Sequence, residues 1–228
     1  MEIFWRFSKD FLGFCTGEAG MGKTTLVETF LAEIEREDAL WIGRGQCLKH
    51  YGAGEAYLPV LEAVGRLCKE SGRQALIALL ARQAPTWLVQ MPWLVDGAEF
   101  EALQRRVLGA TRERMLREMA ETIEALAAER PLVLVLEDLH WSDPSTIDLI
   151  ALLARRREPA RLLILATYRP AEAMLHSHPL QGVKHDLSLH GQCHELPLRL
   201  LTEHEVAEYL ATRFSAVAVP VELTRFLH

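Results

Sequence analysis

Long apolar runs and an export signal are missing from this sequence of 228 residues. Its densest apolar runs, Leu132–Leu136 and Leu162–Ala166, are far shorter than the ~20 residues that a membrane-spanning helix needs. The N-terminus carries Glu2 where a secretory signal has basic residues. We therefore predict neither a membrane protein nor an exported one, and we expect a cytoplasmic location.

Cysteine is scarce and scattered. There is no Cys-x-x-Cys pair among the four cysteines, which are Cys15, Cys47, Cys68 and Cys193. This spacing argues against a disulfide framework and against a zinc knuckle, and it fits a reducing compartment.

An excess of basic residues is also lacking. The 25 Lys and Arg residues stand against 31 Asp and Glu, which gives a formal net charge of −6. The composition therefore provides no general attraction to nucleic acid. With 50% hydrophobic and 25% charged residues, the chain has an ordinary globular composition, which excludes a disordered protein.

Strands and helices are predicted to alternate along the chain. Apolar runs predict buried strands over residues 11–15, 39–43, 132–136 and 161–167, and a glycine-rich loop over 44–57. Helical spacing and capping residues predict helices over 23–36, 144–157 and 203–214, and a mostly helical stretch over about 57–128 that breaks near 111–114. This order predicts an α/β fold, in which helices cover both faces of a parallel sheet and residues 57–128 form a helical insertion.

A phosphate-binding loop lies between the first predicted strand and the first predicted helix. The pattern G-x-x-x-x-G-K-[ST] is matched by Gly17, Glu18, Ala19, Gly20, Met21, Gly22, Lys23 and Thr24, and Thr25 follows. Such glycines let backbone N–H groups surround a polyphosphate. We expect Lys23 to reach the β- and γ-phosphates and Thr24 to offer its hydroxyl to Mg²⁺. The alternative is a glycine-rich turn that contains a lysine by chance.

Two adjacent acids, Glu137 and Asp138, end the most apolar strand, as in a Walker B motif. By position, Glu137 is predicted to hold Mg²⁺ and Asp138 to polarise the attacking water. Because the usual order is Asp then Glu, the reverse assignment stays open. We interpret His140 and Trp141, which follow the acids after Leu139, as residues that pack and shape the loop.

Arg169 follows the last clear strand, at the edge of the sheet where open α/β folds bind ligands. Our hypothesis is that Arg169 contacts the γ-phosphate and reports whether it is present, while Thr167 helps to orient water. The alternative is a surface arginine. The candidate catalytic residues are thus Asp138, Glu137 and Arg169.

Three weaker candidates have simpler explanations. An arginine finger within 155–157 is less favoured than ordinary cations in a last helical turn. A metal site is not favoured because the spacing of His176, His178, His185, His190 and His194 fits no standard zinc site. Trp87 and Trp93 are interpreted as core or interface anchors rather than as platforms for base stacking.

These motifs, with the stretches at 45–52, 84–93 and 136–143, resemble the AAA/STAND class of P-loop ATPases. Within that class the chain is most similar to bacterial domains described as origin-recognition-complex-like AAA ATPase domains, from about residue 11 to the C-terminus. The resemblance implies ATP rather than GTP, and a switch that follows the nucleotide state. It also implies partner domains or proteins in a larger regulator.

Two departures from the family set the expected organisation. Residues 1–10 do not match the segment that seats the adenine in the family, and the chain ends before the rest of a helical lid. We therefore expect an unmatched leader (1–10), an ATPase core (11–170) and the start of a truncated lid (171–228).

The expected function is that of an ATP-binding, Mg²⁺-dependent, slowly hydrolysing switch module of a bacterial signalling or transcriptional regulator. The alternatives are a nucleotide-binding module with little or no hydrolysis, and a small-molecule kinase. Binding to a membrane or directly to nucleic acid is not expected.

Overall fold

The computed structural model describes residues 12–37, 40–49, 55–69, 73–156, 160–214, 220 and 223–225. The chain forms two compact units, one that runs to Pro197 and one that begins at Leu198. The first unit extends past residue 170, where the predicted core ends, because further helices and a strand belong to it. The expectations for the leader at 1–10 lie outside the described residues.

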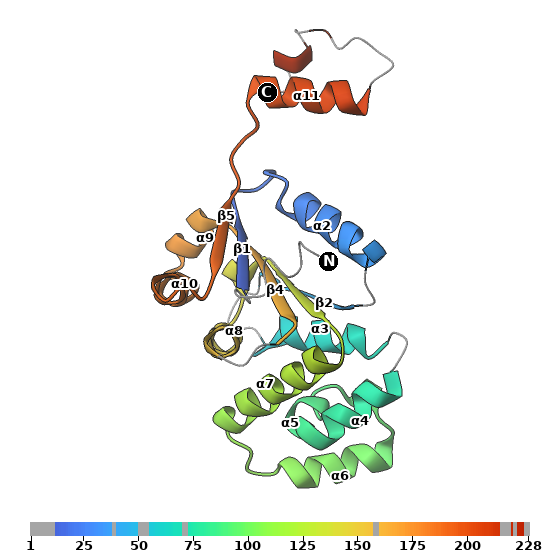
Figure 1. Ribbon diagram of the computed structural model, residues 1–228. Helices are drawn as coiled ribbons and strands as arrows, with labels where there is room; N and C mark the ends of the chain where they lie inside the picture. The colour runs from blue at the N-terminus through green and yellow to red at the C-terminus, as the bar shows by residue number, and fades with distance from the viewer. Residues whose placement is uncertain are drawn as a thin grey trace. The chain divides into compact units, whose positions relative to one another are not determined.

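A five-stranded parallel sheet organises the first unit (Figure 1). The order across the sheet is β2-β3-β4-β1-β5. The strands are β1 (Leu12–Thr16), β2 (Trp41–Gln46), β3 (Leu132–Glu137), β4 (Leu162–Tyr168) and β5 (His194–Pro197). All described pairings are parallel, so the loops after β1, β3 and β4 meet at one edge of the sheet. The predicted α/β class is confirmed.

The side chains of β3 alternate between two apolar clusters, which explains why this strand has no polar alternation. Val133 and Val135 pack with Leu31 of α2 (Lys23–Glu37) in one cluster. Leu132, Leu134 and Leu136 belong to the larger cluster on the opposite face. Both faces of the strand are therefore buried away from solvent.

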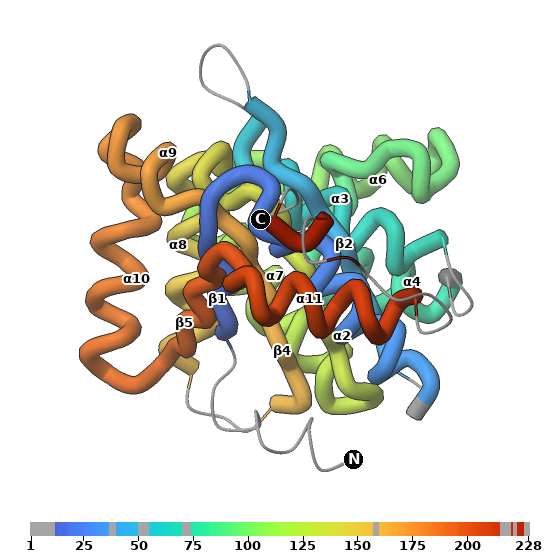
Figure 2. Tube along the Cα trace, turned by 90° about the horizontal axis from the view of Figure 1, so that it is seen from above, coloured from blue at the N-terminus to red at the C-terminus, as the bar shows by residue number. Residues whose placement is uncertain are grey.

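Helices cover both faces of the sheet, as predicted. The face opposite α2 carries α8 (Pro144–Arg155), α9 (Pro170–Leu175) and α10 (Leu180–Leu189). Figures 1 and 2 agree in placing α8 and α10 on one side of the strands and α2 on the other. Asp143 caps α8 by accepting hydrogen bonds from the backbone N–H groups of Ser145 and Thr146, which confirms the predicted start of that helix.

The described part of the stretch between β2 and β3 is mostly helical, with short irregular connections between the helices. Its elements are α3 (Leu58–Leu67), α4 (Arg73–Gln83), α5 (Pro85–Leu88), the 3-10 turn η1 (Pro92–Leu94), α6 (Gly97–Val107) and α7 (Arg112–Glu129). The predicted break near 111–114 is confirmed, because α6 ends at Val107 and α7 begins at Arg112. Thr111 caps α7 by accepting the N–H of Arg114.

The helix α3 lies directly on the sheet instead of standing apart in an insertion. A Cβ added at Gly45 would lie 1.7 Å from the carbonyl oxygen of Pro59, so only glycine allows this close approach. The glycine-rich composition of residues 44–57 made the sequence predict a loop from residue 44, whereas β2 continues to Gln46. That boundary was wrong because Gly45 allows close packing of β2 against α3 and does not reverse the chain.

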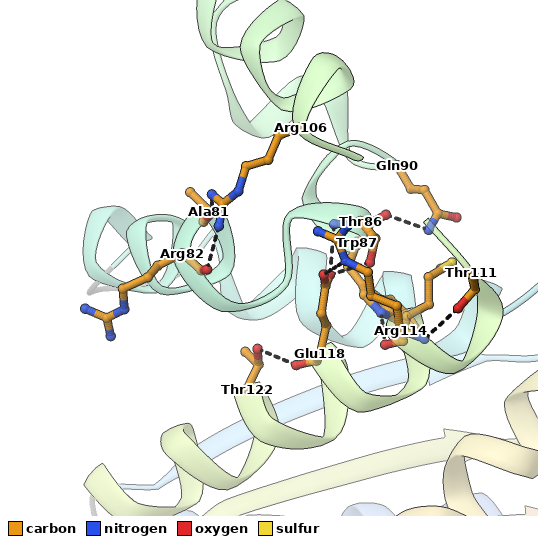
Figure 3. A network of polar contacts seen from close by, with 11 residues as sticks. Ala81, Arg82, Thr86, Trp87, Gln90, Arg106, Thr111, Arg114, Glu118 and Thr122 are labelled. Atoms are coloured by element: carbon orange, nitrogen blue, oxygen red, sulfur yellow. Dashed lines mark hydrogen bonds and ion pairs between the residues drawn. The ribbon is translucent and has the colours of Figure 1, made fainter. Parts of the chain in front are cut away.

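A buried carboxylate fastens α5 to α7 (Figure 3). Glu118 Oε2 accepts hydrogen bonds from the backbone N–H of Thr86 at 3.1 Å and from its hydroxyl at 2.5 Å. Glu118 Oε1 accepts the Nε–H of Arg114 at 2.7 Å. The fully buried indole of Trp87 adds a bond to the carbonyl of Met115 at 2.8 Å. The interpretation of Trp87 as a core residue is confirmed.

The second unit contains α11 (Glu203–Arg213), which matches the predicted helix. Thr202 and Glu205 form a reciprocal capping box at its start, and Glu205 also pairs with Arg199. The guanidinium of Arg199 and the donors of Thr202 lower the pKa of Glu205 to about 2. Among the described residues of the whole chain, no helix is long and apolar enough to cross a membrane.

Candidate nucleotide-binding site

The glycine-rich loop connects the end of β1 to the start of α2. Gly20 and Gly22 both have φ +81°, a backbone conformation that residues with a side chain rarely adopt. The loop also closes on itself, because the N–H of Met21 bonds to the carbonyl of Glu18 at 3.4 Å. Gly22, a fixed glycine of the motif, and Gly20, at one of its variable positions, therefore both meet a conformational need of the loop.

Lys23 folds back over the loop that precedes it. Its Nζ donates to the carbonyl oxygens of Gly17 at 2.7 Å and of Glu18 at 2.8 Å, and the residue is only 8% exposed. A nearly buried ammonium group needs such partners. Its positive charge is thus held inside the loop, where an anionic polyphosphate would meet it, so the residues present fit that group.

Thr24 and Glu137 come together although 113 residues separate them. The hydroxyl of Thr24 donates to Glu137 Oε2 at 3.2 Å, which joins the first turn of α2 to the end of β3. Hydroxyl and carboxylate oxygens are hard ligands of the kind that Mg²⁺ takes. The donor set of the two predicted magnesium ligands therefore fits this ion.

Asp138 has a different environment from that of Glu137. Its backbone is left-handed, with φ 57°, and its N–H donates to the hydroxyl of Thr167 at 3.0 Å. This bond ties the end of β3 to the end of β4. The structure therefore separates the two adjacent acids: Glu137 faces Thr24, and the main chain of Asp138 is held by Thr167.

Arg169 stands at the start of α9, at the same edge of the sheet. Its Nη1 donates to Glu172 Oε1 at 2.6 Å, and its backbone N–H donates to His140 Nδ1 at 3.3 Å. Its Nε is buried and has no hydrogen-bond partner in the described part of the chain. The guanidinium is thus paired within α9 and keeps an unused donor.

His140 is a member of the site that sequence reasoning treated as packing. Its ring is buried, and Nε2 lies 3.8 Å from Glu172 Oε2. Burial lowers the pKa of His140, although Asp138 and Glu172 act in the opposite direction. The ring is then neutral near pH 7, which suits an Nδ1 that accepts the N–H of Arg169. Its place two residues after Asp138 is the signal that could have identified it.

Glu18 and Glu172 are further site residues whose contacts the sequence did not indicate. Glu18 Oε1 accepts the backbone N–H of Ala171 at 3.1 Å, across 153 residues. Glu172 lies between Arg169 and His140 and has a lowered pKa: burial raises it, but the hydrogen bond from Arg169 and the nearby charges outweigh that effect. The three loops at this edge are therefore linked through side chains.

The weaker candidates lie in ordinary structural contacts. Arg155 pairs with Asp186 at 2.7 Å, and Arg156 pairs with Glu124. Arg157 lies outside the described residues. Over the part of the chain that the structure describes, no group of three or more His, Cys, Asp or Glu residues could hold a metal ion.

The family of the chain follows from comparison with known proteins. A family model described as AAA ATPase domain matches residues 12–165, which is more than half of the chain. The chain belongs to the AAA ATPase domain family. Such a domain is ATPase-like and binds nucleotide, and the matched residues contain both the glycine-rich loop and the two acids at the end of β3.

A curated relative and two solved structures extend this result. The chain is 30% identical over 172 residues to an uncharacterized protein of Rhizobium meliloti (strain 1021). This alignment covers 69% of the chain and 16% of the relative. The Walker-type ATPase of Pyrococcus abyssi has a TM-score of 0.50 at 15% identity, covering 97% of this chain and 59% of that one. The Aeropyrum pernix ORC2 protein, solved as ADPNP–ADP complexes, has a TM-score of 0.52 at 18% identity, covering 98% and 52%. At these identities the two structures show the shared fold alone.

Proposed function

We propose that this AAA domain binds ATP with Mg²⁺, hydrolyses it slowly, and serves as a nucleotide-dependent switch in a bacterial signalling or transcriptional regulator of the STAND class. The observation that carries the proposal is the contact between Thr24 and Glu137. It joins the glycine-rich loop to the acidic end of β3, so one polyphosphate and its metal ion would meet both.

Each residue at this edge has a proposed role. Residues 17–25 bind the phosphates, with Lys23 as the main cation, and Thr24 and Glu137 hold Mg²⁺. When bound, Mg²⁺ supplies positive charge that neutralises the phosphate oxygens. Asp138 orients the attacking water and accepts its proton, while Thr167 keeps the backbone of Asp138 in place. The separate surroundings of the two acids support this assignment over its reverse.

The pairing of Arg169 supports slow turnover and a switch. To reach a γ-phosphate, its guanidinium must leave Glu172, to which it is bonded at 2.6 Å. Exchanging that carboxylate for a phosphate would make the position of Arg169 depend on whether the bound nucleotide is ATP or ADP. The same pairing favours the second candidate, a nucleotide-binding module with little or no hydrolysis, if Arg169 stays bonded to Glu172 when nucleotide binds. The guanidinium would then never reach the γ-phosphate.

The setting in a larger protein rests on the relatives. The chain spans 16% of its curated relative. We propose that other domains of a longer regulator, or separate proteins, read the nucleotide state in the cytoplasm, and that the segment after Pro197 with α11 begins a helical lid. Neither nucleic acid nor a membrane is a proposed direct partner of this domain.

The test follows nucleotide binding and phosphate release together, with and without Mg²⁺, and without any acceptor molecule. We expect Mg²⁺ to strengthen the binding of ATP, and Glu137→Gln to remove most of that gain. Glu129→Gln, a change at an exposed acid just before β3, is the matched control. If the wild-type protein binds ATP equally tightly with and without Mg²⁺, the proposed magnesium site is wrong. Binding without any phosphate release would favour the second candidate.

A further inference from the structure

The side chain of Glu18 leaves the glycine-rich loop and reaches the helix that follows β4. Its Oε1 accepts the backbone N–H of Ala171 at 3.1 Å. Ala171 lies in the first turn of α9, two residues after Arg169. The N–H groups of a first helical turn have no partner within the helix, so an acceptor from elsewhere holds that turn in place. Glu18 is thus an anchor for the segment that carries Arg169.

The main chain of Glu18 is engaged at the same time by the lysine of the loop. Its carbonyl oxygen accepts a hydrogen bond from Lys23 Nζ at 2.8 Å. One residue therefore contacts Lys23 through its main chain and α9 through its carboxylate. A phosphate that draws the ammonium of Lys23 toward itself changes a contact that holds Glu18.

The charge of Glu18 also needs an explanation. A carboxylate in a loop that binds anions is unfavourable, because like charges repel one another. The bond to Ala171 directs this carboxylate toward α9. The contact thus accounts for an acid at a position of the motif that tolerates any residue.

We infer that Glu18 is a positioning residue, which sets the place of Arg169 through Ala171 and so links occupancy of the glycine-rich loop to the arginine that distinguishes ATP from ADP. This inference rests on the proposed function of Arg169. His140 also holds this segment of the backbone, because its Nδ1 accepts the N–H of Arg169 at 3.3 Å. Two contacts from two different loops therefore fix the position of the backbone from which the side chain of Arg169 extends.

The experiment compares the dissociation constants of ATP and ADP, with Mg²⁺ present, in five variants. Glu18→Ala is expected to reduce the preference for ATP by about threefold to tenfold, the effect of one lost hydrogen bond to a partly exposed charged acceptor. Glu18→Gln retains an oxygen that accepts the same N–H, so it should keep most of the preference. Glu18→Ala combined with Arg169→Ala should lower the preference no further than Arg169→Ala alone, since both act through one guanidinium.

The control is Glu35→Ala, which removes the same charge from an exposed position near the far end of α2. It should leave the preference unchanged. Hydrogen exchange at the Ala171 amide gives a second readout, which should be faster in Glu18→Ala and close to wild type in Glu18→Gln. Should the alanine variant not fold, Glu18→Leu, which fills similar space without an acceptor, replaces it.

The outcomes separate the two proposals. If Arg169→Ala narrows the ATP preference but Glu18→Ala does not, or if their effects add, the linkage is overturned and the role of Arg169 stands. If Arg169→Ala leaves the preference of the wild-type protein intact, the proposed role of Arg169 fails, and the linkage fails with it.

Discussion

Removing the carboxylate of Glu118 should be among the most destabilising single changes in the helical region between β2 and β3. Glu118 is 8% exposed and Thr86 is 4% exposed, so the donors of Thr86 cannot turn to water when their acceptor is lost. In Glu118→Ala, the N–H and the hydroxyl of Thr86 are left without a partner. Each such group costs about 1–3 kcal/mol when buried.

The pair with Arg114 adds less, because the side chain of Arg114 is 35% exposed and water screens its charge. Taken together, we expect Glu118→Ala to lower the free energy of unfolding by about 3–5 kcal/mol. Glu118→Gln, which keeps one carbonyl oxygen as an acceptor for Thr86, should lose roughly half as much.

The assay is urea unfolding followed by tryptophan fluorescence, since Trp87 lies beside this network and is fully buried. The midpoint should shift while the slope stays the same, which marks a change in stability rather than in compactness. Glu121→Ala, an exposed position on the same helix, is the control and should cost no more than about 0.5 kcal/mol. A loss in Glu118→Ala as small as that of the control would refute the reasoning.

Three other predictions concern the site, the sheet edge and the packing of α3. Asp138→Asn should leave ATP binding largely intact and stop phosphate release, and unchanged release would move the catalytic role to another residue. The pKa of Glu195 is lowered, because hydrogen bonds from Lys184 and Tyr168 outweigh the burial that raises it. The ionised carboxylate of Glu195 therefore adds stability above the ordinary carboxyl pKa of about 4.3, and this contribution is lost as the pH falls through the pKa of the folded protein. Glu195→Gln should thus have a lower free energy of unfolding than the wild type at neutral pH, and the difference between the two should become smaller in acid. Gly45→Ala should prevent stable folding or lower the melting temperature strongly, because its Cβ would overlap the backbone of α3.

Much of the fold could be predicted from local pattern. The strand at 132–136 is apolar at every position, and Asp143 and Thr202 are of residue types preferred as caps at helix starts. The strand β5 could not be predicted in this way. Its residues His194–Pro197 are all exposed and have no apolar run, so its strand conformation comes from pairing with β1.

The candidate site divides along a similar line. The glycine-rich loop and the two acids at the end of β3 are contiguous motifs, so their chemistry can be recognised from the amino-acid sequence alone. The bond of Glu18 to Ala171 joins residues 153 positions apart, and no sequence motif predicts that these two residues are in contact. Contacts of this kind depend on which loops the order of the strands brings together. The local sequence does not specify that order.

The central claim, that this AAA domain binds ATP through its glycine-rich loop, is tested most directly by titrating Lys23→Ala with ATP and Mg²⁺ in a calorimeter. Loss of the nearly buried ammonium group should weaken binding about 100-fold or more, the effect of ~3 kcal/mol of charge-assisted contact. Lys69→Ala, at an exposed lysine after α3, should bind as the wild-type protein does. If Lys23→Ala binds ATP as tightly as the wild type, the loop is not the phosphate site and the account is wrong.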